Sequence, residues 1–91
     1  MASLNLARFD LVSIRLAVTA AQSGSLTAAA AEAHLALAAA SRRLRELEAA
    51  LGTPLFERHS RGLQVTAAGR LFAQHGLTLL QAMDRIGVEL S

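Results

Sequence analysis

The sequence predicts a mainly α-helical domain in which three helices and a small β-hairpin precede one long helix. Three observations predict it: helical periodicity over most of the chain, strand-like alternation after Pro54, and a return to helical spacing from Ala67. Ninety-one residues suffice for one domain with a modest core. Because a core of that size gains from burying a helix against a second copy, we expect an oligomer.

The basic residues are all arginine, nine against seven acids, and they gather in the middle of the chain. Residues 37–70 hold six Arg and three Glu, a net charge of +3, whereas the rest sums to −1. Guanidinium groups suit phosphate and guanine, so this charge indicates a nucleic-acid partner. The lack of cysteine excludes disulfides and thiolate chemistry. No apolar run is long enough to span a membrane, and we expect a cytoplasmic protein without a membrane partner.

The first helix is expected from Asp10 to about Gln22. Its apolar residues form two stripes on roughly opposite sides, which predicts burial on two faces. The stripes are Phe9, Val12, Leu16 and Ala20, and Leu11, Ile14, Val18 and Ala21. Gly24 ends this helix by adopting a left-handed conformation, and Ser25 caps the helix that follows.

Two helices follow, from Leu26 to about His34 and from Leu37 to Leu51, with a turn at residues 35–37. The turn has no local signal; we infer it because one continuous helix would rotate the two apolar stripes apart. The second helix has a core-facing stripe of Ala40, Leu44, Leu47 and Leu51, and opposite it lie Ala38, Arg42, Arg45 and Ala49. Small residues beside guanidinium groups are typical of a recognition helix in the DNA major groove. The alternative is a solvated basic face.

The periodicity changes after Gly52, which ends the helix, and Pro54 prevents its continuation. Strand, turn and strand are expected at residues 55–58, 59–62 and 63–66. A hairpin beside a helix-turn-helix is a wing, so the predicted fold is a winged helix-turn-helix. Arg58 and Arg61 lie at the base and tip of the wing, where they can reach the DNA backbone or minor groove. The alternative is a hairpin that only improves solubility.

The last helix is expected from Ala67 to about Leu90, with Thr66 as its N-cap. Apolar residues recur at offsets of three and four along it, forming a seam of about two heptads. One small domain can hardly cover such a seam, so we expect it to be a dimer interface. The interface residues are Phe72, His75, Leu79, Ala82, Met83 and Ile86. Leu77 and Leu80 lie off the seam, and the helix should therefore also contact the first helix.

Over essentially its whole length the chain resembles the amino-terminal DNA-binding domain of LysR-type transcriptional regulators. The motifs that carry the resemblance are Gly24-Ser25-Leu26-Thr27 with Ala29-Ala30, Ser41-Arg42, Leu47-Glu48 with Leu51-Gly52, Pro54-Leu55-Phe56-Glu57-Arg58, Arg61-Gly62, and Thr66 with Ala68-Gly69. The resemblance implies a bacterial transcription factor with a winged helix-turn-helix at 1–66 and a linker helix at 67–91 that pairs antiparallel with its copy. It also implies an effector-binding domain, absent from this chain, as the site for a small-molecule effector.

The expected DNA-binding residues combine the basic face with this resemblance. They are Thr27, Leu37, Ala38, Ser41, Arg42, Arg45, Arg58 and Arg61. The chain departs from the family at residues 36–38, where Ala-Leu-Ala replaces the common Ser-Gln-Pro or Ser-Gln-Ser. Ala36 cannot cap the helix through its side chain, and Leu37 replaces a glutamine able to hydrogen-bond to DNA. Leu37 can instead contact a thymine methyl group.

The predicted function is regulation of transcription by a homodimer that binds an interrupted palindrome in double-stranded DNA. One competing class is a protein–protein module, and salt-sensitive binding to a duplex distinguishes the two. The other class is an enzyme, for which the sequence offers only His34, His59 and His75 on separate elements without a paired acid. We therefore expect no catalytic site, no metal site and no cofactor.

Overall fold

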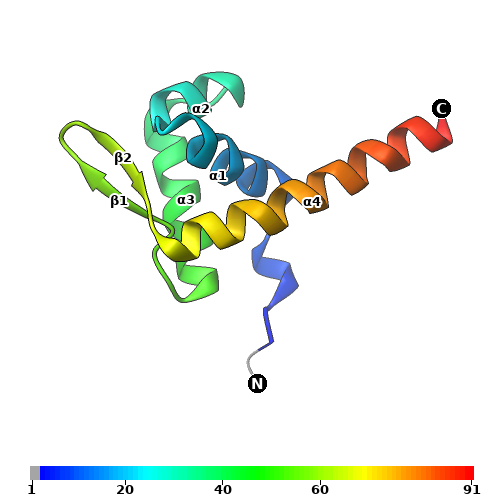
Figure 1. Ribbon diagram of the computed structural model, residues 1–91, viewed down its shortest axis with the longest axis horizontal. Helices are drawn as coiled ribbons and strands as arrows, with labels where there is room; N and C mark the ends of the chain where they lie inside the picture. Colours follow the sequence, from blue (N-terminus) through cyan, green and yellow to red (C-terminus); the bar gives the residue numbers. More distant parts are fainter. Residues whose placement is uncertain (1–2) are drawn as a thin grey trace.

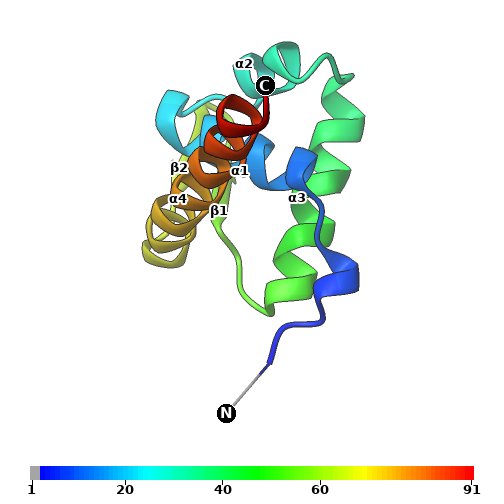
Figure 2. The same ribbon diagram turned by 90° about the vertical axis from the view of Figure 1, so that its right-hand side faces the viewer.

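The computed structural model describes residues 3–91 and has the expected architecture (Figure 1). Its elements are the 3-10 helix η1 (Leu6–Arg8), α1 (Leu11–Ser23), α2 (Leu26–Glu32), α3 (Leu37–Leu51), β1 (Phe56–His59), β2 (Gly62–Val65) and α4 (Ala67–Leu90). The helices α1 to α3 pack together, the two-stranded hairpin projects from one side, and α4 crosses α1 and extends beyond it (Figures 1 and 2). The winged helix-turn-helix followed by a long helix is therefore confirmed, with the short η1 as an addition.

The helix ends follow most of the predicted caps. Gly24 and Gly52 adopt left-handed conformations, with φ of 70° and 76°, directly after α1 and α3. The hydroxyls of Ser25 and Thr66 each accept a hydrogen bond from the backbone N–H three residues on, at 3.1 and 2.9 Å. Asp10 precedes α1 as its N-cap instead of forming its first residue. These caps fix where the helices begin and end because they satisfy otherwise unpaired backbone groups.

The main core lies between α1, α2, α3 and the start of the hairpin. Its most deeply buried large side chains are Leu16, Leu44 and Leu55. The predicted stripe of α3 is confirmed, since Ala40, Leu44 and Leu47 are buried and Leu51 packs against the same cluster. The opposite side of α3 is consequently left at the surface.

A second, smaller cluster joins α1 to α4. Ile14, Val18 and Leu80 are buried together there, so α1 is covered on two faces and α4 contacts its own first helix. The expected burial does not extend to Leu11 and Val12 of the predicted stripes or to Leu77 of α4, which are exposed. Gly76 permits this close crossing, because a Cβ atom at that position would lie 2.8 Å from the Val18 Cγ2 atom. The first half of α4 is thereby held firmly against the rest of the domain.

The turn between α2 and α3 begins earlier than the sequence predicts. Helix α2 ends at Glu32, and His34 adopts a left-handed backbone conformation with φ of 57°. The Leu35 N–H donates a hydrogen bond to the Ala30 carbonyl at 2.9 Å, which closes the helix end as in a Schellman motif. Glycine usually occupies the left-handed position of this motif and histidine does so less often, so the sequence signal at this position is weak.

Each strand of the hairpin lies one residue nearer the turn than the sequence predicts. The strands pair antiparallel with Phe56 opposite Val65 and His59 opposite Gly62. The connecting turn therefore has two residues, 60 and 61, and not the four that the sequence predicts. Alternation of apolar and polar residues identifies a strand but leaves its ends uncertain by this amount.

Helix α4 has one covered half and one open half. Phe72, the first residue of the predicted seam, is half-buried and packs against both clusters of its own chain. Further along, Leu79, Met83 and Ile86 are 45%, 43% and 49% exposed, as the predicted seam requires. Ala82 is half-buried and His75 is exposed. Among the described residues, no helix is both long and apolar enough to cross a membrane.

Candidate nucleic-acid interface

The outer face of α3 presents arginine side chains on a rigid support. Arg42 and Arg45 are exposed, and their helix is held from behind by the buried leucines of the core. Among the described residues, neither arginine forms an ion pair. Ala38 and Ala49 on the same face are also exposed, and their small side chains leave room for a ligand to approach the helix backbone. Two guanidinium groups are thus available at an accessible surface.

The first turn of α3 lacks a polar cap, as the sequence predicts. Ala36 makes no side-chain hydrogen bond to the helix, which leaves its early N–H groups open to solvent or a ligand. Leu37 is half-exposed beside it, and Ser41 is half-buried one turn further on. Thr27, in the first turn of α2, is exposed. The sites predicted on the helix-turn-helix are therefore all at least partly accessible, with Ser41 the most covered.

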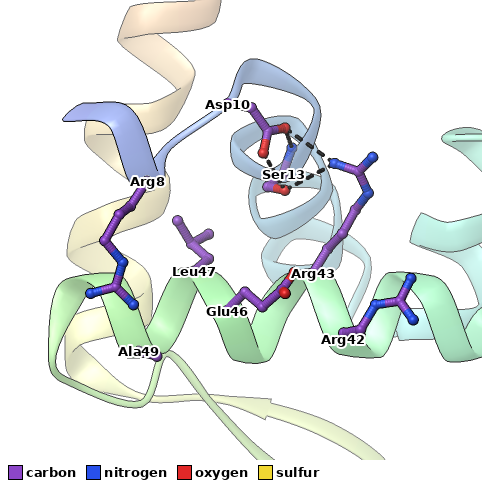
Figure 3. Close-up of a pocket in the computed structure, with 8 residues that line it drawn as sticks. All are labelled: Arg8, Asp10, Ser13, Arg42, Arg43, Glu46, Leu47 and Ala49. Atoms are coloured by element: carbon purple, nitrogen blue, oxygen red, sulfur yellow. Dashed lines mark hydrogen bonds and ion pairs between the residues drawn. The ribbon is translucent and has the colours of Figure 1, made fainter. Parts of the chain in front are cut away.

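Arg43 has a role that sequence reasoning missed. Its Nη1 atom lies 3.3 Å from both Asp10 Oδ1 and Ser13 Oγ (Figure 3). Asp10 also caps α1, because its carboxylate accepts hydrogen bonds from the Ser13 N–H and hydroxyl at 2.8 and 3.0 Å. Arg43 therefore ties one edge of α3 to the beginning of α1. The only sequence signal is Asp three residues before Ser, a helix start, which gives no hint of the distant arginine.

Glu48 ties the opposite edge of α3 to the hairpin. Its Oε2 atom accepts hydrogen bonds from the Leu55 and Phe56 N–H groups at 2.7 and 3.2 Å. Its Oε1 atom lies 3.4 Å from Arg58 Nη2. The Glu48 side chain is only 12% exposed, so it holds these partners in a partly desolvated setting. This carboxylate sets the position of the wing relative to the recognition helix.

The two hairpin arginines differ as a result. Arg58 is drawn back toward Glu48, and its side chain is 28% exposed. Arg61 lies in the two-residue turn at the tip, is exposed, and has no ion-pair partner in the described part of the chain. The His59 Nε2 atom lies 3.5 Å from Glu57 Oε2 on the exposed side of the hairpin. Arg61 is therefore the hairpin cation most accessible to a ligand.

A cleft of about 300 Å³ separates the hairpin from the start of α2. Its lining includes Thr27, Arg58 and Arg61, which the sequence predicted as binding residues on different elements. Two basic side chains and the hydroxyl-bearing first turn of a helix suit a phosphate group. Within residues 3–91, no group of three His, Cys, Asp or Glu side chains is placed to hold a metal ion. The surface thus carries exposed arginines and small side chains that let a ligand approach the α3 backbone closely, and nucleic-acid recognition requires both.

Comparison with known sequences agrees with this geometry. Residues 11–70 match the model of the family described as bacterial regulatory helix-turn-helix protein, lysR family. The chain is 38% identical over 85 residues to the HTH-type transcriptional regulator GbpR of Azospirillum brasilense, covering 93% of this chain and 25% of that protein. It is 39% identical over 72 residues to PunR of Escherichia coli K12, covering 79% and 23% respectively. The chain thus spans about a quarter of the length of these relatives.

Solved structures agree as well. The crystal structure of a BenM_DBD/catB site 1 DNA complex matches with a TM-score of 0.84 and 32% identity, over 90% of this chain and 91% of that one. A CbnR_DBD–DNA complex matches with a TM-score of 0.83 and 31% identity, over 89% and 93%. The family model covers the same residues as the sequence motifs and as the winged helix-turn-helix fold. The chain belongs to the LysR family of bacterial helix-turn-helix regulatory proteins.

Proposed function

We propose that this chain is the DNA-binding domain of a transcription regulator and that it binds double-stranded DNA through α3, the start of α2 and the hairpin. The observation that carries the proposal is the pair of exposed arginines, Arg42 and Arg45, on a helix whose other side is buried. Similar domains are bound to DNA in the BenM_DBD and CbnR_DBD complexes, which supports the same use of this surface. A domain of this kind acts on chromosomal DNA in the bacterial cytoplasm.

Helix α3 occupies the major groove in this proposal. Arg42 and Arg45 contact base edges and the adjacent phosphates, since a guanidinium group matches the two acceptors of guanine. Ala38 and Ser41 allow the helix to approach the groove floor closely. Leu37, which is half-exposed, contacts a thymine methyl group.

The hairpin and α2 supply contacts to the DNA backbone. Thr27 and Arg61 face the cleft beside the hairpin and bind phosphates there. Arg58 contributes less, because Glu48 already holds its guanidinium group. These contacts set affinity and orientation, and α3 reads the sequence.

The domain acts as a homodimer through the open half of α4. Leu79, Met83 and Ile86 are the exposed apolar side chains that a second copy would cover. Burial of such side chains contributes roughly 1.5–3 kcal/mol each, against a large cost of association. Two-fold pairing presents two α3 helices to one face of the duplex and selects an interrupted palindrome.

The proposal is tested by selecting a duplex from random DNA and measuring its affinity across a range of salt concentrations. We expect tight binding that weakens steeply with salt, because phosphate contacts release counterions. No selected sequence and no salt-dependent binding would overturn the proposed function.

Dimerisation is tested separately by sedimentation of Leu79→Asp, with Leu77→Asp as control. Leu77 is 38% exposed but lies off the seam, so the two substitutions add the same charge in different places. The seam variant should lose both the dimer and most of its DNA affinity, because a charge in a dry interface is costly. Equal dimerisation of the two variants would contradict an interface along this face of α4.

A further inference from the structure

A second cleft, of about 590 Å³, lies along the edge of α3 that faces away from the hairpin. Its walls come from α3 and from the residues before and at the start of α1 (Figure 3). Neither the predicted binding residues nor the family-matched stretch accounts for all of it, because Arg8 in its wall precedes residue 11.

The charged groups of this cleft leave one net positive charge. Its arginines are Arg8, Arg42 and Arg43, and its acids are Asp10 and Glu46, giving +3 − 2 = +1. Arg43 and Asp10 neutralise one another through their ion pair at 3.3 Å. The remaining charges of the cleft are the two arginines, Arg8 and Arg42, and the single carboxylate of Glu46. Among the described residues, neither arginine has an ion-pair partner. In Figure 3, Arg8 lies over the C-terminal half of α3 and Arg42 lies nearer its start.

Arg8 is presented by a fixed turn. The Asn5 side chain caps η1 by accepting a hydrogen bond from the Ala7 N–H at 3.2 Å. On the other side of the turn, Phe9 packs against the main core. Arg8 therefore lies between a capped turn start and a core anchor, and ordering it at a ligand requires little further loss of backbone freedom.

The hairpin and η1 lie on opposite sides of α3. In Figure 1, α3 lies between the hairpin on the left and the N-terminal segment on the right, and Figure 2 places η1 alongside the lower part of α3. The major groove of B-DNA is about 12 Å wide and is bordered by a phosphate backbone on each side. A helix in that groove therefore has a phosphate wall near each of its edges, and the hairpin serves only one of them.

We propose that Arg8, assisted by Arg42, binds a backbone phosphate on the wall of the groove opposite the hairpin. This inference rests on the proposed DNA binding and adds a contact from outside the family-matched residues. The open half of α4 extends on the η1 side of α3, away from the hairpin (Figure 1). If a partner copy pairs with this part of α4, the edge of α3 that carries η1 faces the two-fold axis of the dimer, and the hairpin edge faces away from it. The phosphate held by Arg8 thus lies between the two half-sites, and the phosphates held by the hairpin lie outside them.

Glu46 provides an opposite test of the same cleft. Its exposed carboxylate lies between the two arginines and repels a phosphate in that position. Glu46→Gln removes this repulsion without changing the size of the side chain. It should strengthen DNA binding, and the gain should vanish when Arg8 is also replaced.

The experiment compares Arg8→Gln with Arg15→Gln on the selected palindromic duplex. Arg15 is an exposed arginine on α1 that lines neither basic cleft beside α3, so both variants lose the same formal charge. Arg8→Gln should reduce the slope of log affinity against log salt by about 0.9 per chain, or about 1.8 per dimer. Arg15→Gln should leave the slope nearly unchanged, and Arg8→Lys should restore most of it. Sedimentation checks that all variants remain dimers.

Ethylation of individual phosphates in the duplex locates the contact. Ethylation of a phosphate between the half-sites should weaken binding of the unmodified protein but not of Arg8→Gln. Equal slopes for Arg8→Gln and Arg15→Gln, with normal binding by the unmodified protein, would overturn the inference and leave the proposed function intact. The inference would also be overturned if Arg8→Gln became insensitive to ethylation only at phosphates outside the half-sites. Failure of the unmodified protein to bind any duplex would instead overturn the proposed function first.

Discussion

Arginines lie on the outer face of α3 and also beside each of its two edges, but the side chains in these places have different surroundings. On the outer face, Arg42 and Arg45 form no ion pair with any described residue. At the edges, Arg43 is held by the start of α1, and Arg58 of the hairpin is held by Glu48. The edge residues fix neighbouring elements onto the helix, whereas the outer residues keep their donors for a ligand.

This division separates two tasks along one helix. Contacts at the edges hold α1 and the hairpin in place before any ligand arrives, which lowers the ordering cost of binding. In the proposed function, the outer face makes its contacts only when DNA is bound. Substitutions at the edges should therefore change the free energy of unfolding, and those on the outer face should change DNA binding.

The largest effect is expected at the hairpin edge, for Glu48→Ala. The substitution leaves the Leu55 and Phe56 N–H groups and the Arg58 guanidinium without their acceptor. Losing hydrogen bonds to a partly buried charge should lower the free energy of unfolding by about 2–4 kcal/mol. Urea denaturation measures this, with Glu46→Ala as the control, because Glu46 is exposed on the same helix. Equal stability of the two variants would show that the carboxylate does not hold the hairpin.

On the outer face, Arg42→Ala should weaken DNA binding by about 1–3 kcal/mol and relax the preference at one base pair. Its free energy of unfolding should stay within about 0.5 kcal/mol of the unmodified protein, because the side chain is exposed. Binding to a panel of single-base variants of the selected duplex measures the change in affinity and preference, and urea denaturation measures the stability. A folded variant with unchanged affinity and unchanged preference would remove Arg42 from the base contacts.

At the other edge of α3, Arg43→Ala should have a smaller effect than Arg42→Ala and should change stability and not DNA binding. The ion pair with Asp10 is partly solvated, with side chains 36% and 53% exposed, so its loss should lower the free energy of unfolding by about 1 kcal/mol or less. The base preference of the domain should not change. An altered preference in the binding panel, at unchanged stability, would show that Arg43 leaves Asp10 to contact DNA.

The smallest expected effect is a difference in salt dependence between substitutions of the two hairpin arginines, Arg61 and Arg58. Arg61→Gln should reduce the slope of log affinity against log salt by about 0.9 for each phosphate that the arginine neutralises in the complex. Arg58→Gln should reduce it by less, because Glu48 already neutralises that side chain. Salt titrations of both variants on one duplex make the comparison. A larger change for Arg58 would mean that its ion pair opens when DNA binds.

Periodicity predicts the parts of this fold that repeat along the chain. The buried stripe of α3 follows from the spacing of its leucines, and the helix ends follow from Gly24, Gly52, Ser25 and Thr66. The turn before α3 is displaced because His34 takes a conformation that glycine usually adopts. The three residues of η1 are too few for periodicity to reveal.

The candidate site is predictable only where it faces outward. Exposure of Arg42 and Arg45 follows from their position opposite the core stripe. The partners of Arg43 lie 30 and 33 residues away in the sequence, and no local pattern connects them. Phe72 illustrates the same limit, since a heptad pattern shows which side of α4 is apolar but not whether its own domain covers it.

The crossing of α1 and α4 at Gly76 has a consequence for the spacing of DNA half-sites. From Gly76 to Leu90 the helix rises about 21 Å, at about 1.5 Å per residue. A bulkier residue at position 76 would meet the Val18 side chain, so either that side chain or the helix crossing would have to shift. A tilt of about 10° would move the end of this arm by about 4 Å, close to the rise of one base pair at about 3.4 Å. In the proposed dimer, such a tilt would shift the preferred gap between half-sites by about one base pair, although none of the proposed DNA-binding residues changes.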